Sequence, residues 1–108
     1  MRPTENTLHV LYVDDDPDSA ESTSDMLERL DDRFTVRSAT SVSDGLEHIR
    51  RDTPDCIVST YELPKQNGVE FLELIREEYP DLPFILYAEN GSEGVASDAI
   101  SAGVTEYL

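Results

Sequence analysis

The amino-acid sequence predicts an α/β domain in which a parallel sheet is covered by helices on both faces. Short apolar runs alternate along the chain with amphipathic stretches of about ten residues, and short turns separate them. This alternation is typical of a parallel sheet, and right-handed crossovers make such a sheet doubly wound. With 108 residues, the chain has the length of one domain or slightly less.

The five expected strands are short apolar runs. They cover residues 8–13, 34–38, 56–60, 84–88 and 107–108. Prolines stand between several of these runs and the neighbouring amphipathic stretches, where they stop one element before the next begins. The chain contains no internal repeat, linker or low-complexity segment, so the five strands are expected to form one sheet.

The four expected helices cover residues 17–30, 41–51, 67–79 and 92–102. Their limits are marked by capping residues, namely Asp16 before Pro17, the capping boxes Ser41 with Asp44 and Asn67 with Glu70, and Gly103 after the fourth helix. Apolar residues at helical spacing are Ala20, Met26, Leu27 and Leu30, then Val42, Leu46 and Ile49, and then Val69, Leu72 and Ile75. These side chains are expected to face the sheet.

The chain is strongly acidic, with 24 acidic residues, 8 basic residues and a net charge of -16. This charge opposes nucleic-acid phosphates, so direct DNA binding by this segment is not expected. The acids are spread over all the helices, which favours a solvated surface suited to high salt over a binding face for a basic partner. No apolar run is long enough to span a membrane, and the N-terminus lacks the apolar segment of a signal peptide, which predicts a cytoplasmic protein.

The ends of two expected strands carry the most informative residues. The run at residues 8–13 stops at Asp14-Asp15-Asp16-Pro17, and the run at residues 56–60 stops at Thr60-Tyr61-Glu62-Leu63-Pro64, followed by Asn67-Gly68. Together these motifs resemble the receiver domain of two-component response regulators. The resemblance spans about the whole chain and indicates a degenerate receiver, or pseudo-receiver, of a halophilic archaeal type.

The resemblance implies a flavodoxin-like sheet with strand order 2-1-3-4-5 and a site beyond the carboxyl ends of strands one and three. In that family two acids after strand one hold Mg²⁺, and an aspartate at the end of strand three accepts a phosphoryl group. Asp15 would then be the direct Mg²⁺ ligand, and Asp14 would act through water. The backbone carbonyl of Glu62 would be a third ligand.

Alignment on the proline and glycine of the motif places Thr60 at the acceptor position. A threonine hydroxyl without an adjacent base is a far weaker nucleophile than a carboxylate, and Mg²⁺ loses an anionic ligand, so Mg²⁺ is expected to bind only weakly. Asp55 cannot substitute, because it lies about 16 Å back along an extended strand. The family's hydroxyl-bearing switch position falls on Ala88, and its lysine would fall just beyond Leu108. The resemblance therefore implies loss of phosphoryl acceptance.

Several alternatives stay open. The side chain of Glu62 could swing toward the metal, or a phospho-accepting regulator with a non-standard site could use Thr60 itself. The three acids after the first strand could merely cap the following helix. The pattern Asp14-x-Asp16 also resembles haloacid-dehalogenase-type phosphotransferases, although these have a glycine where this chain has Pro17.

The resemblance also implies an organisation of the chain and a set of partners. Residues 1–7 would be a flexible N-terminus, and residues 8–108 would be a receiver domain that is truncated after strand five, without the family's last helix. Rather than acting as an enzyme, the chain would act on a partner protein such as a histidine kinase, or on a downstream output domain. Apolar residues on helix four and strand five would form a homodimer interface. They are Val95, Ile100, Val104 and Leu108.

Overall fold

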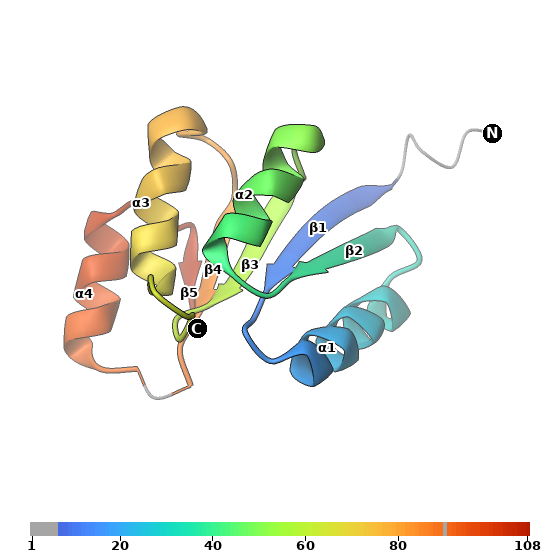
Figure 1. Ribbon diagram of the computed structural model, residues 1–108, viewed down its shortest axis with the longest axis horizontal. Coiled ribbons are helices and arrows are strands. Elements are labelled where there is room, and N and C mark those ends of the chain that lie inside the picture. Colours follow the sequence, from blue (N-terminus) through green and yellow to red (C-terminus); the bar gives the residue numbers. More distant parts are fainter. Residues whose placement is uncertain (1–6, 90) are drawn as a thin grey trace.

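A computed structural model of the chain describes residues 7–89 and 91–108. Strands and helices alternate along the whole of this part of the chain (Figure 1). The elements are β1 (Leu8–Val13), α1 (Pro17–Leu30), β2 (Phe34–Ala39), α2 (Val42–Arg51), β3 (Cys56–Thr60), α3 (Gly68–Glu78), β4 (Phe84–Tyr87), α4 (Glu93–Ser101) and β5 (Glu106–Tyr107). The expected elements are confirmed to within one residue at most ends. The N-terminal segment expected to be flexible falls, apart from Thr7, outside the described residues.

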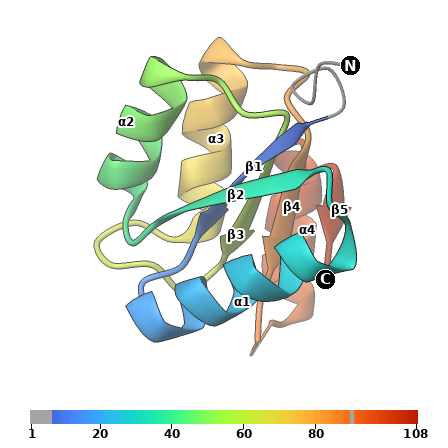
Figure 2. The ribbon, with the colours of Figure 1, turned by 90° about the vertical axis from the view of Figure 1, so that its right-hand side faces the viewer.

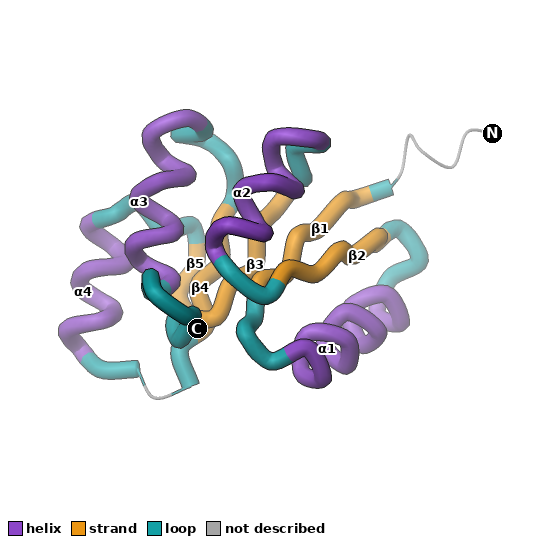
Figure 3. Tube along the Cα trace, viewed as in Figure 1, coloured by secondary structure: helices purple, strands orange, loops and turns teal. Residues whose placement is uncertain are grey.

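The five strands form one parallel sheet in the order β2-β1-β3-β4-β5. Helix α1 lies on one side of this sheet, and α2, α3 and α4 lie on the other (Figures 1 and 2). The tube in Figure 3 shows how each helix carries the chain from one strand to the next across a face of the sheet. The predicted flavodoxin-like, doubly wound architecture is therefore confirmed. None of the described helices is long and apolar enough to cross a membrane.

The core lies mainly between the sheet and the helices α2 and α3. Phe71 of α3 and Phe84 of β4 are fully buried and meet edge to face, with ring centroids 5.6 Å apart at an interplanar angle of 67°. The inward residues expected on α3, namely Val69, Leu72 and Ile75, are all buried. On α2, Val42 and Ile49 are buried, and Leu46 is partly buried against the same core.

Helix α1 buries less of its apolar side than its sequence pattern predicts. Ala20 is fully buried, but Met26 is 54% exposed and Leu30 is 71% exposed, so these two apolar residues are not part of the core. The helix packs over β1 and β2, at one edge of the sheet. No other described helix lies on this side of the sheet, and Met26 borders a groove there.

The helix caps follow the sequence pattern with one exception. The Asp16 carboxylate accepts the N–H groups of Asp18 and Ser19 at the start of α1. Asn67 and Glu70 form a complete reciprocal capping box at the start of α3. At the start of α2, the Ser41 hydroxyl accepts the N–H of Asp44 as expected.

The capping box predicted at Ser41 is nevertheless incomplete. The carboxylate of Asp44 accepts the N–H of Thr40, at 3.3 Å, instead of the N–H of the cap residue itself. At the other end of the chain, Gly103 adopts φ +91° after α4, as expected for a glycine that ends a helix.

Candidate functional site

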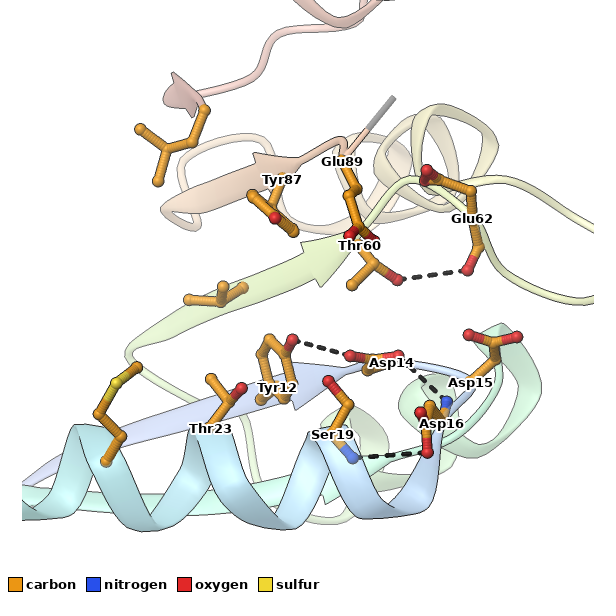
Figure 4. A pocket seen from close by; sticks show the side chains of 13 residues that line it. Tyr12, Asp14, Asp15, Asp16, Ser19, Thr23, Thr60, Glu62, Tyr87 and Glu89 are labelled. Atoms are coloured by element: carbon orange, nitrogen blue, oxygen red, sulfur yellow. Dashed lines mark hydrogen bonds between the residues drawn. The ribbon is translucent and has the colours of Figure 1, made fainter. Parts of the chain in front are cut away.

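The register of the sheet brings the two informative strand ends together. Val13 of β1 pairs with Ser59 of β3, so the next residues of the two strands, Asp14 and Thr60, lie side by side where the strands end. Both residues border a groove of about 660 Å³ on the α1 side of the sheet (Figure 4). The sequence prediction that Asp14, Asp15 and Thr60 meet at one end of the sheet is therefore confirmed.

The groove has an acidic part and an apolar part. Its acidic residues are Asp14, Asp15, Asp16, Glu62 and Glu89, and its apolar and aromatic residues include Tyr12, Met26, Val58, Tyr87 and Leu108. No basic side chain lines it among the described residues. An anion entering this groove would meet only negative charge from the side chains of the described chain.

Asp14 is the buried acid of the site, with 6% of its surface exposed. Its two carboxylate oxygens have different partners within its own strand end. Oδ2 accepts the hydroxyl of Tyr12 at 2.9 Å, and Oδ1 accepts the main-chain N–H of Asp16 at 3.1 Å (Figure 4). Each oxygen therefore has a hydrogen-bond donor, which a buried carboxylate requires.

Tyr12 is itself largely buried, and its hydroxyl stays protonated over a wide pH range. Burial and, after it, the hydrogen bond to the Asp14 carboxylate raise the pKa of Tyr12 to about 12. A hydrogen bond from Thr23 of α1 acts in the opposite direction. The Tyr12 hydroxyl is consequently a permanent hydrogen-bond donor to Asp14 at neutral pH.

Thr60 ends β3 with its side chain inside the site and only 9% of its surface exposed. Its hydroxyl lies 3.3 Å from the carbonyl oxygen of Glu62 and 3.5 Å from the carbonyl oxygen of Val13. The hydroxyl has a single proton for the two carbonyl oxygens. Because the distance to Glu62 is the shorter one, the contact with Glu62 is the better hydrogen bond. Backbone carbonyls are neutral and cannot take the proton away, so neither contact activates the hydroxyl as a nucleophile.

The loop after Thr60 is held against the strand end by a glycine. The N–H of Gly68 donates to the carbonyl of Tyr61 at 2.7 Å. A β-carbon at Gly68 would lie 2.5 Å from Cδ1 of Leu86 and 2.6 Å from the carbonyl oxygen of Thr60. The start of α3 can therefore approach the site this closely only with glycine at this position.

The residues expected to bind Mg²⁺ fit this role only in part. The carbonyl of Glu62 is present at the site but faces the Thr60 hydroxyl, and Asp14 already has two donors. Asp15 borders the groove and is exposed. In the described part of the chain, no group of three or more His, Cys, Asp or Glu side chains is arranged to hold a metal ion. The residues that would hold a hard divalent cation are thus two carboxylates and one carbonyl, and water would complete the coordination.

The expected switch position, Ala88, does not line the groove, although its neighbours Tyr87 and Glu89 do. Its β-carbon lies instead near Gly91, where an added β-carbon would be 3.1 Å away and only 2.2 Å from the hydroxyl of Tyr107. Tyr107 is thus packed against the loop that follows β4.

Asp55 lies at the opposite end of the sheet, as expected from its distance along β3. Its carboxylate accepts the N–H of His9 at 2.8 Å, and its own N–H donates to the His9 carbonyl. Asp55 is therefore no substitute for an acceptor at Thr60.

Sequence reasoning missed Tyr12 as part of the site, because it read the whole first strand as apolar core. The signal was available, since alternate residues of a strand point to the same face and Tyr12 stands two residues before Asp14. Thr23 and Tyr87, which also border the groove, carry no comparable signal.

Comparisons with known proteins agree with this geometry. A model of the response regulator receiver domain matches residues 10–108. The probable C4-dicarboxylate response regulator DctR of Halalkalibacterium halodurans is 29% identical over 104 residues, which are 96% of this chain and 45% of the relative. Response regulator protein PilR of Pseudomonas aeruginosa is 30% identical over 98 residues, which are 91% of this chain and 22% of the relative. The chain therefore spans less than half the length of these curated relatives.

Solved structures show the same fold. A response regulator receiver domain protein from Clostridium thermocellum superposes with a TM-score of 0.85 at 25% identity, covering 94% of this chain and 80% of that chain. Chemotaxis protein CheY4 of Vibrio cholerae superposes with a TM-score of 0.87 at 23% identity, covering 94% of this chain and 85% of that chain. These matches favour the receiver over the haloacid-dehalogenase-type alternative, whose second acid, Asp16, here caps α1. The chain belongs to the response regulator receiver domain family of two-component systems.

Proposed function

We propose that this receiver domain does not accept a phosphoryl group and acts as a protein-interaction or regulatory module rather than as an enzyme. The single observation that carries the proposal is the position of Thr60 at the end of β3, beside the buried Asp14. An acyl phosphate can form only on a carboxylate. The side chain that stands beside Asp14 at the acceptor position has none.

The surroundings of Thr60 support the same conclusion. A threonine needs an adjacent base to attack phosphorus, and its hydroxyl contacts two neutral carbonyls instead. The nearest buried carboxylate, Asp14, has both oxygens engaged by donors from its own strand end. Among the described residues, the hydrogen bonds of the Thr60 hydroxyl therefore go to carbonyls and not to a carboxylate that could accept its proton.

Ala88 supports a second part of the proposal, namely that the domain does not change its conformation in response to a phosphoryl group. Where the family has a hydroxyl that follows the phosphoryl group, this chain has a methyl group that packs near Gly91 and Tyr107. The residue that directly follows β4 then has no hydroxyl with which to report a change at the acidic site. We infer that the domain presents one constant surface to its partners.

This assignment also sets the expected ligand and partners. Mg²⁺ would bind weakly at Asp14, Asp15 and the Glu62 carbonyl, because the acceptor carboxylate is replaced. The partner would be another protein, such as a histidine kinase, or an output domain of a longer chain, in the cytoplasm. Direct nucleic-acid binding by this domain would be opposed by the net charge of -16.

Intact-mass spectrometry tests the proposal directly. The chain is incubated with Mg²⁺ and acetyl phosphate, in parallel with a receiver that has an acceptor aspartate, which shows that the reagent is active. We expect no gain of one phosphate. A phosphate that hydroxylamine removes would reveal an acyl phosphate on an acid such as Glu62, and one that resists hydroxylamine would reveal phosphorylation of Thr60. Either adduct would overturn the proposal.

A further inference from the structure

The groove contains a hydrogen bond that the family resemblance does not account for, between the side chains of Tyr12 and Asp14. The bond is short, at 2.9 Å, and both residues are buried. Hydrogen bonds to ionised groups are about twice as strong as neutral ones. The contact is therefore one of the stronger side-chain interactions available to the acidic site.

A buried carboxylate needs a positive partner or several hydrogen-bond donors, because burial removes its hydration. In a site that holds Mg²⁺, the cation supplies most of this compensation. Here the Tyr12 hydroxyl and the Asp16 N–H supply one donor to each oxygen of Asp14. The carboxylate is thus satisfied by groups from its own chain.

We propose that Tyr12 is a positioning residue that completes the acidic site from within, so that the site is stable without a divalent cation. Its hydroxyl holds Asp14 against β1 and takes up the lone pair on Oδ2 that would otherwise be open to the groove. Thr60 has the same effect on the Glu62 carbonyl, because its hydroxyl donates to that oxygen, although over a longer distance. A cation that approaches must displace these donors or share the oxygens with them.

The placement of Tyr12 supports this role. The residue lies on β1 two positions before Asp14, so both side chains project to the same face of the sheet, and both border the groove (Figure 4). Thr23 of α1 lines the same groove from the helix side. Tyr12 is only 5% exposed, so packing restricts the movement of its side chain.

The inference deepens the proposed function and has its own test. Mg²⁺ is titrated at constant ionic strength into the wild-type chain, Tyr12→Phe and Tyr87→Phe, with binding followed by calorimetry. Tyr12→Phe keeps the ring and removes the donor, so we expect Mg²⁺ to bind about tenfold more tightly than to wild type. Tyr87→Phe removes a hydroxyl of the same groove from β4 and is the matched control, with no expected change.

The opposite role for Tyr12 predicts the opposite result. If the tyrosine oriented Asp14 for the metal, Tyr12→Phe would bind Mg²⁺ more weakly, and that outcome or an unchanged affinity would overturn the inference. A second readout needs no variant. With tyrosine labelled by ¹³C at the carbon that bears the hydroxyl, the Tyr12 signal of the wild-type chain should stay in place as Mg²⁺ is added, and an early shift would count against the proposal. Phosphorylation by acetyl phosphate would overturn the proposed function and leave this comparison intact.

Discussion

The hydroxyl of Thr60 lies 3.3 Å from the carbonyl oxygen of Glu62, two residues further along the chain. The same carbonyl is the one that the family resemblance assigns to Mg²⁺. If Thr60 stands at the acceptor position, as proposed, it would change two ligands at once, because it lacks a carboxylate and directs a hydroxyl proton toward a carbonyl. This relationship makes the behaviour of Thr60 variants informative.

We expect Thr60→Asp to restore a divalent-cation site and, in part, phosphoryl transfer. The new carboxylate would lie beside the buried Asp14, and the repulsion between them should lower the free energy of unfolding by about 1–3 kcal/mol without a cation. Mg²⁺ should recover this loss. Thermal melts with and without Mg²⁺, and intact mass after treatment with acetyl phosphate, measure both effects.

Thr60→Asn is the matched control for this variant, because it has the size of aspartate without the charge. It should show neither the Mg²⁺-dependent stabilisation nor the phosphate adduct. If the aspartate and asparagine variants behave alike, the strand end beside Asp14 is not an acceptor position.

A second prediction concerns Gly68, at the start of α3. Gly68→Ala places a β-carbon 2.5 Å from Cδ1 of Leu86 and 2.6 Å from the carbonyl oxygen of Thr60. The leucine could move, but the backbone at Thr60 could not move without disturbing the site. We expect a loss of about 1–3 kcal/mol in the free energy of unfolding, measured by urea denaturation.

Gly94→Ala is the corresponding control, because a β-carbon there meets only the Ser92 hydroxyl oxygen, at an ordinary 3.6 Å. Alanine favours a helix over glycine by up to about 1 kcal/mol, so this variant should be neutral or slightly stabilising. A Gly68→Ala variant as stable as Gly94→Ala would show that α3 does not approach the strand end so closely.

The fold could be predicted from the sequence because its determinants are local. Each strand is a short apolar run, and caps such as Asp16 and Asn67 mark where helices begin. The proximity of Asp14 and Thr60 could also be predicted from the sequence, because the carboxyl ends of parallel strands share one edge of the sheet.

Features that depend on packing between distant elements could not be predicted in the same way. Met26 is apolar and at helical spacing, yet it is exposed because α1 covers only part of the sheet. The expected apolar patch on α4 and β5 is divided, since Ile100 lies on α4 and Leu108 borders the groove on the other side of the sheet. Val104, expected in the same patch, packs partly buried against the core.

Asp31 should titrate at unusually low pH. Asp31 is the C-cap residue of α1, and its carboxylate accepts the side-chain and backbone N–H groups of Arg33, which lowers its pKa from 3.8 to about 2. Because the folded-state pKa is depressed, the stabilisation is present above pH 3.8 and is lost as the pH falls toward 2. A ¹³C NMR titration of the carboxyl carbon reads this midpoint, and Arg33→Gln should return it toward 3.8. An unchanged midpoint in that variant would exclude Arg33 as the cause.

Stability should rise with salt concentration. Repulsion within a chain of net charge -16 destabilises the compact state, and salt shortens its range from about 10 Å at 0.1 M to about 3 Å at 1 M. The midpoint of thermal unfolding should therefore increase steadily with KCl. A midpoint that stays constant up to molar salt would reject the halophilic interpretation and favour a basic partner for the acidic surface.

The last prediction is that the chain associates with itself through the edge formed by β5. This strand is the last in the sheet order, so one of its sides is open to another chain, and Leu108 next to it is 65% exposed. We expect a two-fold dimer in high salt, where charge repulsion is screened. Leu108→Lys should weaken it, whereas Leu30→Lys, at a residue on α1 that is 71% exposed, should not.

Light scattering over a range of protein concentrations distinguishes these outcomes. The open edge and the exposed leucine act together, because backbone pairing along β5 would bring two copies of Leu108 close to one another and remove both from water. A monomer at every concentration would mean that the edge is protected. Equal effects of Leu108→Lys and Leu30→Lys would mean that the copies meet through α1 or through charge alone, and not through β5.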